Sequence, residues 1–365
     1  MDSNRVYKAS LNLGVTTDGG KSFSSRGGFH SDVHAIWINP HNNNHVIIGT
    51  DGGMYVSFDR ASSWRFFNNL PLAQFYHISY DMDKPYNVYG GLQDNGSWYG
   101  PAESPNGIEN RDWNNAGGGD GFWVWRDKTD KTILYSESQG GNITRIHTKT
   151  NESKDIKPYP KYGEPKYRFN WNTPIQLSPT RPDVIYMGSQ FLHKSTDKGE
   201  SWTNISPDLT TNDKAKQQQE ESGGLSVDNS SAENHCTIYT IAESPMDANI
   251  IWVGTDDGNV QVTQNGGKSW TNVVKNIPGL PANTWCTTVE PGHFAKGTCY
   301  VTFDGHTTGD MKSYIYKTSD FGKTWTEIAS GVKGYVHVVR EDLVNQSLLF
   351  AGTELGMFVS IDGGK

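Results

Sequence analysis

Five carboxylates in this 365-residue chain lie where acid and base chemistry could be arranged, in loops next to short apolar runs. They are Asp32, Asp51, Asp94, Asp120 and Asp256. Glycoside hydrolysis needs two carboxyl groups, roughly 5 to 5.5 Å apart for retention or 6.5 to 9.5 Å apart for inversion. The sequence offers candidates for such a pair but does not say which of them meet.

Other side chains in the same loops could bind a ligand. They are His30, His34, Gln93, Asn95, Trp171, His235, Asp257 and Glu354, and the neighbouring Asn170, Gln190, Asn234, Asp304 and His306 extend the set. Carboxylates and amides around one mouth could hold a divalent cation, a sugar or a basic peptide. The alternative for GTDGG, LQDNG and GTDDG is tight-turn formation, because Asp-Gly and Asn-Gly are strong hairpin signals. We expect no cofactor, with a divalent cation at this mouth as the alternative.

Two short segments in these loops stand out by composition. In FHSDVH, His30, Asp32 and His34 alternate, so an extended chain would place all three side chains on one face, where they could ligate a metal. The alternative is that the histidines cap a strand entrance and bond to backbone. In GGGDGFW, the glycines before Asp120 would let the backbone approach a ligand or a neighbouring sheet closely.

The elements that position these loops are marked by a recurring octet. Its copies are TTDGGKSF from Thr16, SFDRASSW from Ser57, STDKGESW from Ser195, TQNGGKSW from Thr263, TSDFGKTW from Thr318 and a shortened SIDGGK from Ser360. Nearly every copy follows alternating apolar residues, which predicts a strand, a tight turn and another strand. The third residue (Asp18, Asp59, Asp197, Asn265, Asp320 and Asp362) should accept hydrogen bonds from its own turn, so we assign these residues a structural role.

Strands between the octets follow a constant order, with an S-P, N-P or E-P turn and then a strand ending in Gly-Thr or Gly-Ser. Ser57 and Ser195 lie 138 residues apart, which leaves room for two divergent units without an octet. Four strands per unit predict an all-β propeller of four-stranded antiparallel blades, with eight blades preferred over seven. The expected blades of this single domain are 1–27 (partial), 28–70, 71–116, 117–160, 161–210, 230–276, 277–330 and 331–365 (partial). The first should lack its innermost strand and the last its outermost.

Composition excludes several classes of protein. The formal net charge is −8, so nucleic acid is not an expected partner, and no apolar stretch is long enough for membrane insertion. The three cysteines, Cys236, Cys286 and Cys299, lack CxxC spacing and are expected to be buried thiols in strands. Phosphate-binding loops and protease triads are absent from the sequence pattern.

The octet resembles the Asp box, or bacterial neuraminidase repeat, with the pattern S-x-D-x-G-x-[ST]-W. Four further segments resemble bacterial proteins described as sortilin-like or glycosyl-hydrolase-like. They are HSDVHAIWINP, YGGLQDNGSW, GGGDGFW and GSQFLHKSTDKGESW. That resemblance covers almost the whole chain and implies ligand binding on the propeller face opposite the octets. Relatives are usually longer, so the chain is expected to be an excised or engineered segment whose parent is secreted or periplasmic. A sialidase is disfavoured, since the Arg-Ile-Pro motif of that family is absent.

We therefore expect a rigid, monomeric scaffold or binding module that presents acidic, amide and aromatic loops to a carbohydrate or protein. The alternatives are a polysaccharide-acting glycoside hydrolase that uses two of the five carboxylates, and an engineered or truncated propeller without a ligand.

Overall fold

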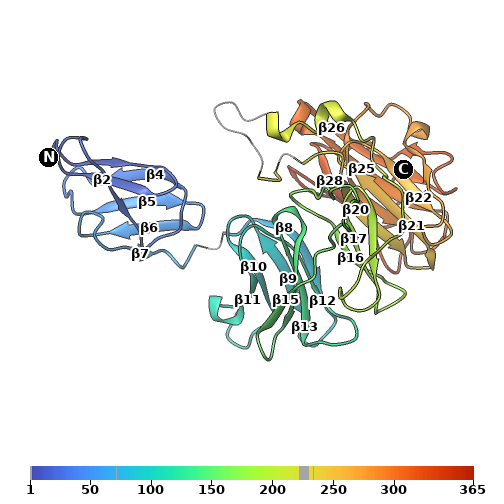
Figure 1. Ribbon diagram of the computed structural model, residues 1–365, viewed down its shortest axis with the longest axis horizontal. Coiled ribbons are helices and arrows are strands. Elements are labelled where there is room, and N and C mark those ends of the chain that lie inside the picture. Colours follow the sequence, from blue (N-terminus) through green and yellow to red (C-terminus); the bar gives the residue numbers. More distant parts are fainter. Residues whose placement is uncertain (1, 71, 222–229, 233) are drawn as a thin grey trace.

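The computed structural model describes residues 2–70, 72–221, 230–232 and 234–365, which form an all-β chain of successive antiparallel sheets (Figure 1). Six sheets have four strands and two have three, and their strands follow chain order. We number them sheet 1 to sheet 8 from the N-terminus. The predicted β-propeller of eight blades is confirmed at the level of these sheets.

The strands of the first four sheets have the following bounds. Sheet 1 holds β1 (Val6–Lys8), β2 (Leu13–Thr16) and β3 (Ser24–Arg26); sheet 2 holds β4 (Val33–Ile38), β5 (Val46–Thr50), β6 (Gly53–Ser57) and β7 (Arg65–Phe66); sheet 3 holds β8 (Phe75–Tyr80), β9 (Asn87–Leu92), β10 (Gly96–Pro101) and β11 (Asn114–Gly117); sheet 4 holds β12 (Gly121–Arg126), β13 (Ile133–Ser138), β14 (Asn142–His147) and β15 (Glu152–Asp155). Sheets 3 and 4 are the two divergent units that the sequence predicts.

The remaining strands complete sheets 5 to 8. Sheet 5 holds β16 (Ile175–Leu177), β17 (Ile185–Gly188), β18 (Leu192–Ser195) and β19 (Thr203–Asn204); sheet 6 holds β20 (Ile238–Ser244), β21 (Asp247–Thr255), β22 (Val260–Thr263) and β23 (Thr271–Asn272); sheet 7 holds β24 (Trp285–Pro291), β25 (Cys299–Gly305), β26 (Asp310–Thr318) and β27 (Thr326–Glu327); sheet 8 holds β28 (Val336–Glu341), β29 (Leu349–Thr353) and β30 (Gly356–Ser360). Single-turn 3-10 helices lie in loops at Asn110–Asp112, Gln139–Gly141, Lys214–Lys216, Gln219–Glu221, Val274–Asn276 and His306–Thr308. Among the described residues, no helix is long and apolar enough to cross a membrane.

The octets form the turns between the third and fourth strands, as predicted. In the octet of sheet 7, Asp320 accepts from Thr318 Oγ1 at 2.8 Å, from the Thr324 N–H at 2.9 Å and from Thr324 Oγ1 at 2.7 Å. Hydrogen bonds from the Thr324 N–H and side chain hold the pKa of Asp320 at about 2, below its usual 3.8. The five other copies repeat the bond between the first and third residues, so these carboxylates and the Asn265 amide are used within the turn.

In four of the six octets, a glycine packs against the preceding sheet. A Cβ on Gly267, where φ is +96°, would lie 2.5 Å from the Ile205 carbonyl oxygen, whereas a Cβ on Gly279, where φ is +70°, would meet nothing within 4 Å. We expect Gly279→Ala to cost about 1 kcal/mol through positive φ alone, and Gly267→Ala roughly 2 kcal/mol more through the clash. Urea unfolding of both variants checks this. Equal losses would show that the octet turn yields to the added methyl group.

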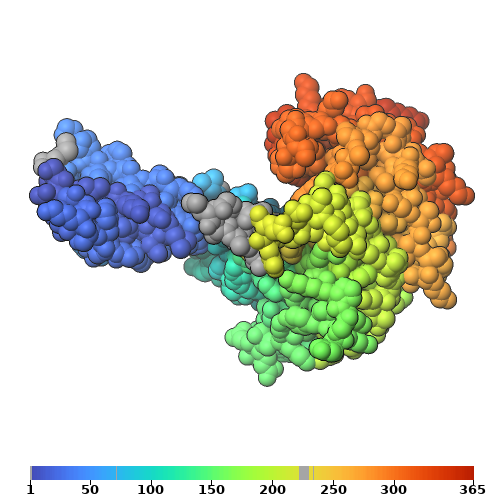
Figure 2. Space-filling model, turned by 45° about the horizontal axis from the view of Figure 1, so that its top comes forward, coloured from blue at the N-terminus to red at the C-terminus, as the bar shows by residue number. Residues whose placement is uncertain are grey.

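Apolar clusters fill the junctions between neighbouring sheets, with one exception. Six clusters join sheets 1 and 2, 3 and 4, 4 and 5, 5 and 6, 6 and 7, and 7 and 8. No cluster of described residues joins sheets 2 and 3, whose facing side chains Trp37, Ile78 and Tyr80 are 48%, 65% and 62% exposed. In Figures 1 and 2, sheets 1 and 2 accordingly stand apart from an arc made by sheets 3 to 8. The two three-stranded sheets therefore do not lie side by side.

Two local expectations from the sequence are wrong. Asp32 has φ +60°, and β4 begins only at Val33, so FHSDVH is a turn that leads into a strand and its side chains do not share one extended face. Cys286 and Cys299 are buried thiols in strands, but Cys236 lies in a turn before β20 with φ +60°. In both cases a left-handed residue that is not glycine interrupts the strand pattern.

Candidate functional site

Four of the predicted carboxylates come together where sheets 2, 3 and 4 meet. Asp32 precedes β4, Asp51 lies between β5 and β6, Asp94 lies between β9 and β10, and Asp120 precedes β12. We call these four residues the acidic cluster. Two of these loops precede the first strand of a sheet, and two join the second strand to the third. Because the two kinds of loop meet, both lie on one side of the sheets, away from the octets.

Asp94 and Asp120 are the closest pair of the cluster. The Asp94 N–H donates to Asp120 Oδ1 at 2.6 Å, and Asp120 is only 8% exposed. Burial raises the pKa of Asp94 to about 6, helped by a hydrogen bond to the Asp120 side chain and by the negative charges of Asp120, Asp51 and Asp32. Asp94 therefore keeps its proton up to about pH 6.

Neighbouring side chains fix the loops of the acidic cluster. His34 Nε2 lies 2.6 Å from Asp51 Oδ1, and His30 Nε2 lies 2.9 Å from the Asp94 carbonyl oxygen. Asn95 Nδ2 donates to the Asp51 carbonyl oxygen at 3.0 Å, so it bridges sheets 2 and 3. No Lys or Arg among the described residues forms an ion pair with these four carboxylates.

The metal hypothesis for His30, Asp32 and His34 finds no geometric support. His30 bonds to backbone carbonyls, His34 to Asp51, and Asp32 Oδ2 accepts from Ser31 Oγ at 2.9 Å. In the part of the chain that the structure describes, no group of three His, Cys, Asp or Glu side chains is arranged to hold a metal ion. The interpretation that the histidines cap a strand entrance fits these contacts.

The glycines before Asp120 serve close approach between sheets and turns. A Cβ on Gly119 would lie 2.5 Å from Gln139 Oε1, and a Cβ on Gly117 would lie 2.9 Å from Ser136 Oγ. Both partners belong to sheet 4 or its loop. Close packing on sheet 4 of the same chain therefore explains why Gly117 and Gly119 lack a side chain. A Cβ on Gly118 would meet nothing within 4 Å.

Aromatic side chains border the acidic cluster, and sequence reasoning missed one of them. Tyr76 of β8 packs on Phe122 with ring centroids 4.4 Å apart, and burial together with the charges of Asp120 and Asp94 raises its pKa to about 12. Half-buried Trp98 donates from Nε1 to the Asn95 carbonyl oxygen at 2.7 Å. Tyr76 lies near the start of β8, the innermost strand of its sheet, and that position was the signal available.

Asp256 lies apart from the acidic cluster in a second, buried group. Asp256 accepts from the Thr237 N–H at 2.8 Å, from Thr237 Oγ1 at 2.5 Å and from Asn170 Nδ2 at 3.1 Å, and His235 Nδ1 lies 3.7 Å away. Burial raises the pKa of Asp256 to about 7 despite these donors. Since its side chain is 0% exposed, Asp256 does not face a ligand directly.

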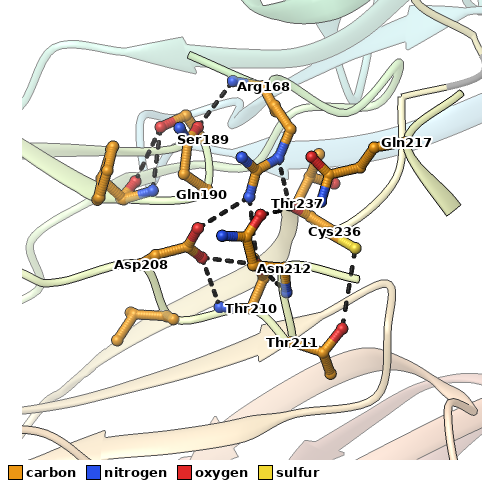
Figure 3. A network of polar contacts seen from close by, with 12 residues as sticks. Arg168, Ser189, Gln190, Asp208, Thr210, Thr211, Asn212, Gln217, Cys236 and Thr237 are labelled. Carbon is orange, nitrogen blue, oxygen red and sulfur yellow. Dashed lines mark hydrogen bonds and ion pairs between the residues drawn. The ribbon is translucent and has the colours of Figure 1, made fainter. Parts of the chain in front are cut away.

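The neighbouring Asp257 is used within the protein. Its Oδ2 accepts from the Thr211 N–H and Thr211 Oγ1, each at 2.7 Å, and its Oδ1 accepts from Thr255 Oγ1 at 2.5 Å. Gln190 is similarly occupied, since its Oε1 accepts from the Arg168 N–H at 2.7 Å. Figure 3 shows Arg168 at the centre of this polar network, where it also bonds to Asp208 and to the Cys236 carbonyl oxygen. The network fixes the loops that carry Thr237 and Asp257.

A third group gathers at the junction of sheets 7 and 8. Asp304 Oδ1 lies 2.7 Å from His306 Nδ1, Asp304 Oδ2 lies 3.5 Å from His337 Nδ1, and His306 stacks on Tyr335 with centroids 4.4 Å apart. Glu354, in the loop before β30, is exposed. Gln93 and Trp171 are half-buried at the entrances of their own sheets. The structure thus distributes the predicted residues over several groups, and the acidic cluster brings together four of the five candidate carboxylates.

Comparisons with known proteins identify the fold. No protein-family model and no curated protein matches the chain. A solved structure of YCF48 from Cyanidioschyzon merolae aligns with TM-score 0.50 at 13% identity, over 90% of this chain and 94% of that one. The GH74 xyloglucanase from Xanthomonas campestris aligns with TM-score 0.31 at 12% identity, over 100% of this chain and 70% of that one. The computationally designed Ika8 protein aligns with TM-score 0.42 at 13% identity, over 99% and 94%. Together with the eight sheets, the YCF48 alignment identifies the fold as a β-propeller.

Proposed function

We propose that this propeller is a rigid binding module and that the acidic cluster is its site for a neutral carbohydrate. The observation that carries the proposal is the meeting of four carboxylates from three sheets without a Lys or Arg ion pair among the described residues. Such oxygens accept hydrogen bonds from sugar hydroxyls. Asn95 and Gln93 add amide groups at the same loops, and Tyr76 and Trp98 add aromatic rings. Because these loops sit on strands, little ordering cost opposes binding.

A second function, glycoside hydrolysis, is favoured by the pKa of Asp94. A carboxyl group that keeps its proton up to about pH 6 is suited to protonate a leaving-group oxygen. Asp120 is too close to Asp94 to be its catalytic partner, since the two are hydrogen-bonded and a glycosidase pair lies roughly 5 Å or more apart. The ionised partner in this scheme is therefore Asp51 or Asp32.

Binding to an array of neutral oligosaccharides tests the first proposal. We expect Asp94→Asn and Asp120→Asn to weaken binding at least tenfold, because each removes a charged acceptor from the cluster. Glu103→Gln is the matched control, since Glu103 is exposed at the other end of sheet 3 and forms no hydrogen bond that the structure records. Equal binding by all three variants would rule out the acidic cluster as the site.

Sugar release from soluble polysaccharides under the same conditions distinguishes the two functions. Hydrolysis through Asp94 should fall as pH rises through about 6, where Asp94 loses its proton, and should vanish in Asp94→Asn. Binding without release supports the module alone. Release that survives in Asp94→Asn would contradict the hydrolytic scheme.

A further inference from the structure

Two apolar faces lie uncovered where sheets 2 and 3 look toward each other. On sheet 2, Trp37 and Met54 are 48% and 39% exposed, and on sheet 3, Ile78 and Tyr80 are 65% and 62% exposed. Figures 1 and 2 show sheet 2 standing apart from sheet 3, and no apolar cluster of described residues joins the two. Uncovered apolar faces of this kind mark sites of protein association.

The strand register shows which side chains belong to each face. In an antiparallel sheet, paired residues point to the same side and successive residues alternate. Trp37 pairs with Ile47 of β5, so both point away from sheet 1, on which Ile48 packs. Ile78 and Tyr80 of β8 point away from sheet 4, because the residue between them bonds to that sheet. Ile47 and Ile78 therefore belong to the two facing surfaces.

The five later junctions show how these two positions normally pack. Strand pairing gives each sheet a counterpart of Ile47 in its second strand and of Ile78 in its first strand, and at each junction the two belong to one apolar cluster. The pairs are Tyr89 with Val124, Tyr135 with Ile175, Tyr186 with Ile241, Trp252 with Val289 and Tyr300 with Val339. All ten side chains are at most 5% exposed. Ile47 is only half-buried and Ile78 is exposed, so the corresponding pair exists between sheets 2 and 3 but is not packed.

The described hydrogen bonds between sheets 2 and 3 of one chain lie in loops. His30 Nε2 lies 2.9 Å from the Asp94 carbonyl oxygen, and Asn95 Nδ2 donates to the Asp51 carbonyl oxygen at 3.0 Å. These bonds join the loops while the faces stay apart, so sheet 2 does not cover Ile78 of its own chain. A second copy in the same arrangement presents the partner of each face and requires no movement within either chain.

The area of the two faces favours an exchange between two copies. At roughly 200 Å² for a large side chain, the exposed parts of Trp37, Met54, Ile78 and Tyr80 amount to roughly 400 Å². An exchange makes this contact twice, which gives roughly 800 Å², and half-buried Ile47, Val88 and Trp98 on the same faces add to it. A specific interface needs about 1,000 Å² in total. Two reciprocal contacts approach that size, whereas a single pair of faces does not.

We propose that two copies of this chain associate by exchanging these faces. Sheet 2 of each copy packs on sheet 3 of the other, with Ile47 of one copy against Ile78 of the other. The dimer is two-fold symmetric, so both copies make the same two contacts. It replaces the monomer that the sequence leads us to expect. The acidic cluster lies in loops outside the two faces, so the proposal does not depend on carbohydrate binding.

Light scattering after size-exclusion chromatography measures the mass of the particle. We expect the wild-type chain to be a dimer at ~100 μM and to dissociate on dilution. Ile78→Asp should weaken the dimer at least a hundredfold, because the symmetric interface buries the added charge twice. The control Val344→Asp, at a loop position that is 87% exposed, should remain dimeric. A monomeric wild-type chain at the highest concentration, or a dimer that Ile78→Asp leaves unchanged, would overturn the proposal.

A mixture of two variants tests the exchange itself. Trp37→Lys alone and Ile78→Asp alone should both be monomeric and keep the circular dichroism of wild type, since both positions are exposed in the single chain. Mixed in equal amounts, they should form a dimer, because one of its two contacts then holds only wild-type residues and the other brings opposite charges together. If Trp37→Lys stays dimeric, sheet 3 meets sheet 3. If the mixture stays monomeric, sheet 2 of one copy does not meet sheet 3 of the other. Either result contradicts the proposal.

Discussion

Arg181→Met should lower the free energy of unfolding by about 3 kcal/mol, because it leaves a buried carboxylate without its counterion. Arg181 Nη2 lies 2.9 Å from Glu243 Oε2, and the Glu243 side chain is 0% exposed. Ser178 Oγ and Tyr186 OH also donate to Glu243, at 2.6 and 2.7 Å, and Thr180 Oγ1 donates as well. Burial alone would raise the pKa of Glu243, but these hydrogen bonds outweigh burial and lower it.

The loss at Arg181 should be measured by urea unfolding at pH 7 beside that of Lys154→Met. Lys154 pairs with Glu200 at 2.5 Å, but the two side chains are 56% and 43% exposed, so this control should cost less than about 1 kcal/mol. Replacing both Arg181 and Glu243 with apolar residues should recover much of the stability, since no unpaired charge remains. If the single and double variants are equally unstable, packing rather than charge explains the effect.

Asp256→Asn should change the dependence of stability on pH. The folded-state pKa of Asp256 is about 7, above its usual 3.8, so the folded protein binds this proton more tightly than the unfolded chain does. Its contribution to stability is therefore full below pH 3.8 and is lost as pH rises toward 7. The difference between the two pKa values corresponds to at most ~4 kcal/mol at about 1.4 kcal/mol per pKa unit.

Two histidines act in the opposite direction over the same pH range. Burial lowers the pKa of His77 and of His193 to about 4, so each adds stability as pH rises from about 4 toward 6.5. The informative quantity is thus the difference between wild type and Asp256→Asn at each pH from 4 to 7.5. We expect the free energy of unfolding of wild type to fall steadily relative to that of Asp256→Asn as pH rises. The Glu103→Gln control should show the same pH dependence as wild type. A difference that stays constant with pH would contradict the raised pKa.

The sequence predicts the elements of this fold well because each octet carries its own chemistry. Thr318, Asp320 and Thr324 close their turn through bonds between residues two and four positions apart, which can be anticipated from the octet alone. The turn geometry is also kept at Ala61, which takes φ +68° at the position where the other copies have glycine. Strand order in the sheets that carry an octet follows from these turns.

Contacts that depend on how sheets face one another could not be predicted from the sequence. Asp94 and Asp120 are 26 positions apart, and the raised pKa of Asp94 depends on burial, on Asp120 and on two further carboxylates from sheet 2. Tyr186 bonds to Glu243 of the next sheet, although nothing in either local pattern pairs them. The empty junction between sheets 2 and 3 is also invisible in the sequence, because Trp37, Ile78 and Tyr80 read as ordinary interior residues.

That junction has a consequence for how the two parts of the chain depend on each other. Described contacts across it are polar and come from loops, such as Asn95 to Asp51 and Asn110 to the Asn68 carbonyl oxygen at 3.4 Å. With little shared apolar surface, we expect sheets 1 and 2 to melt as one cooperative unit and sheets 3 to 8 as another. A ligand that contacts carboxylates of sheet 2 and of sheets 3 and 4 binds only when both units are folded and lie together. Its binding free energy therefore couples the folding of one unit to the folding of the other.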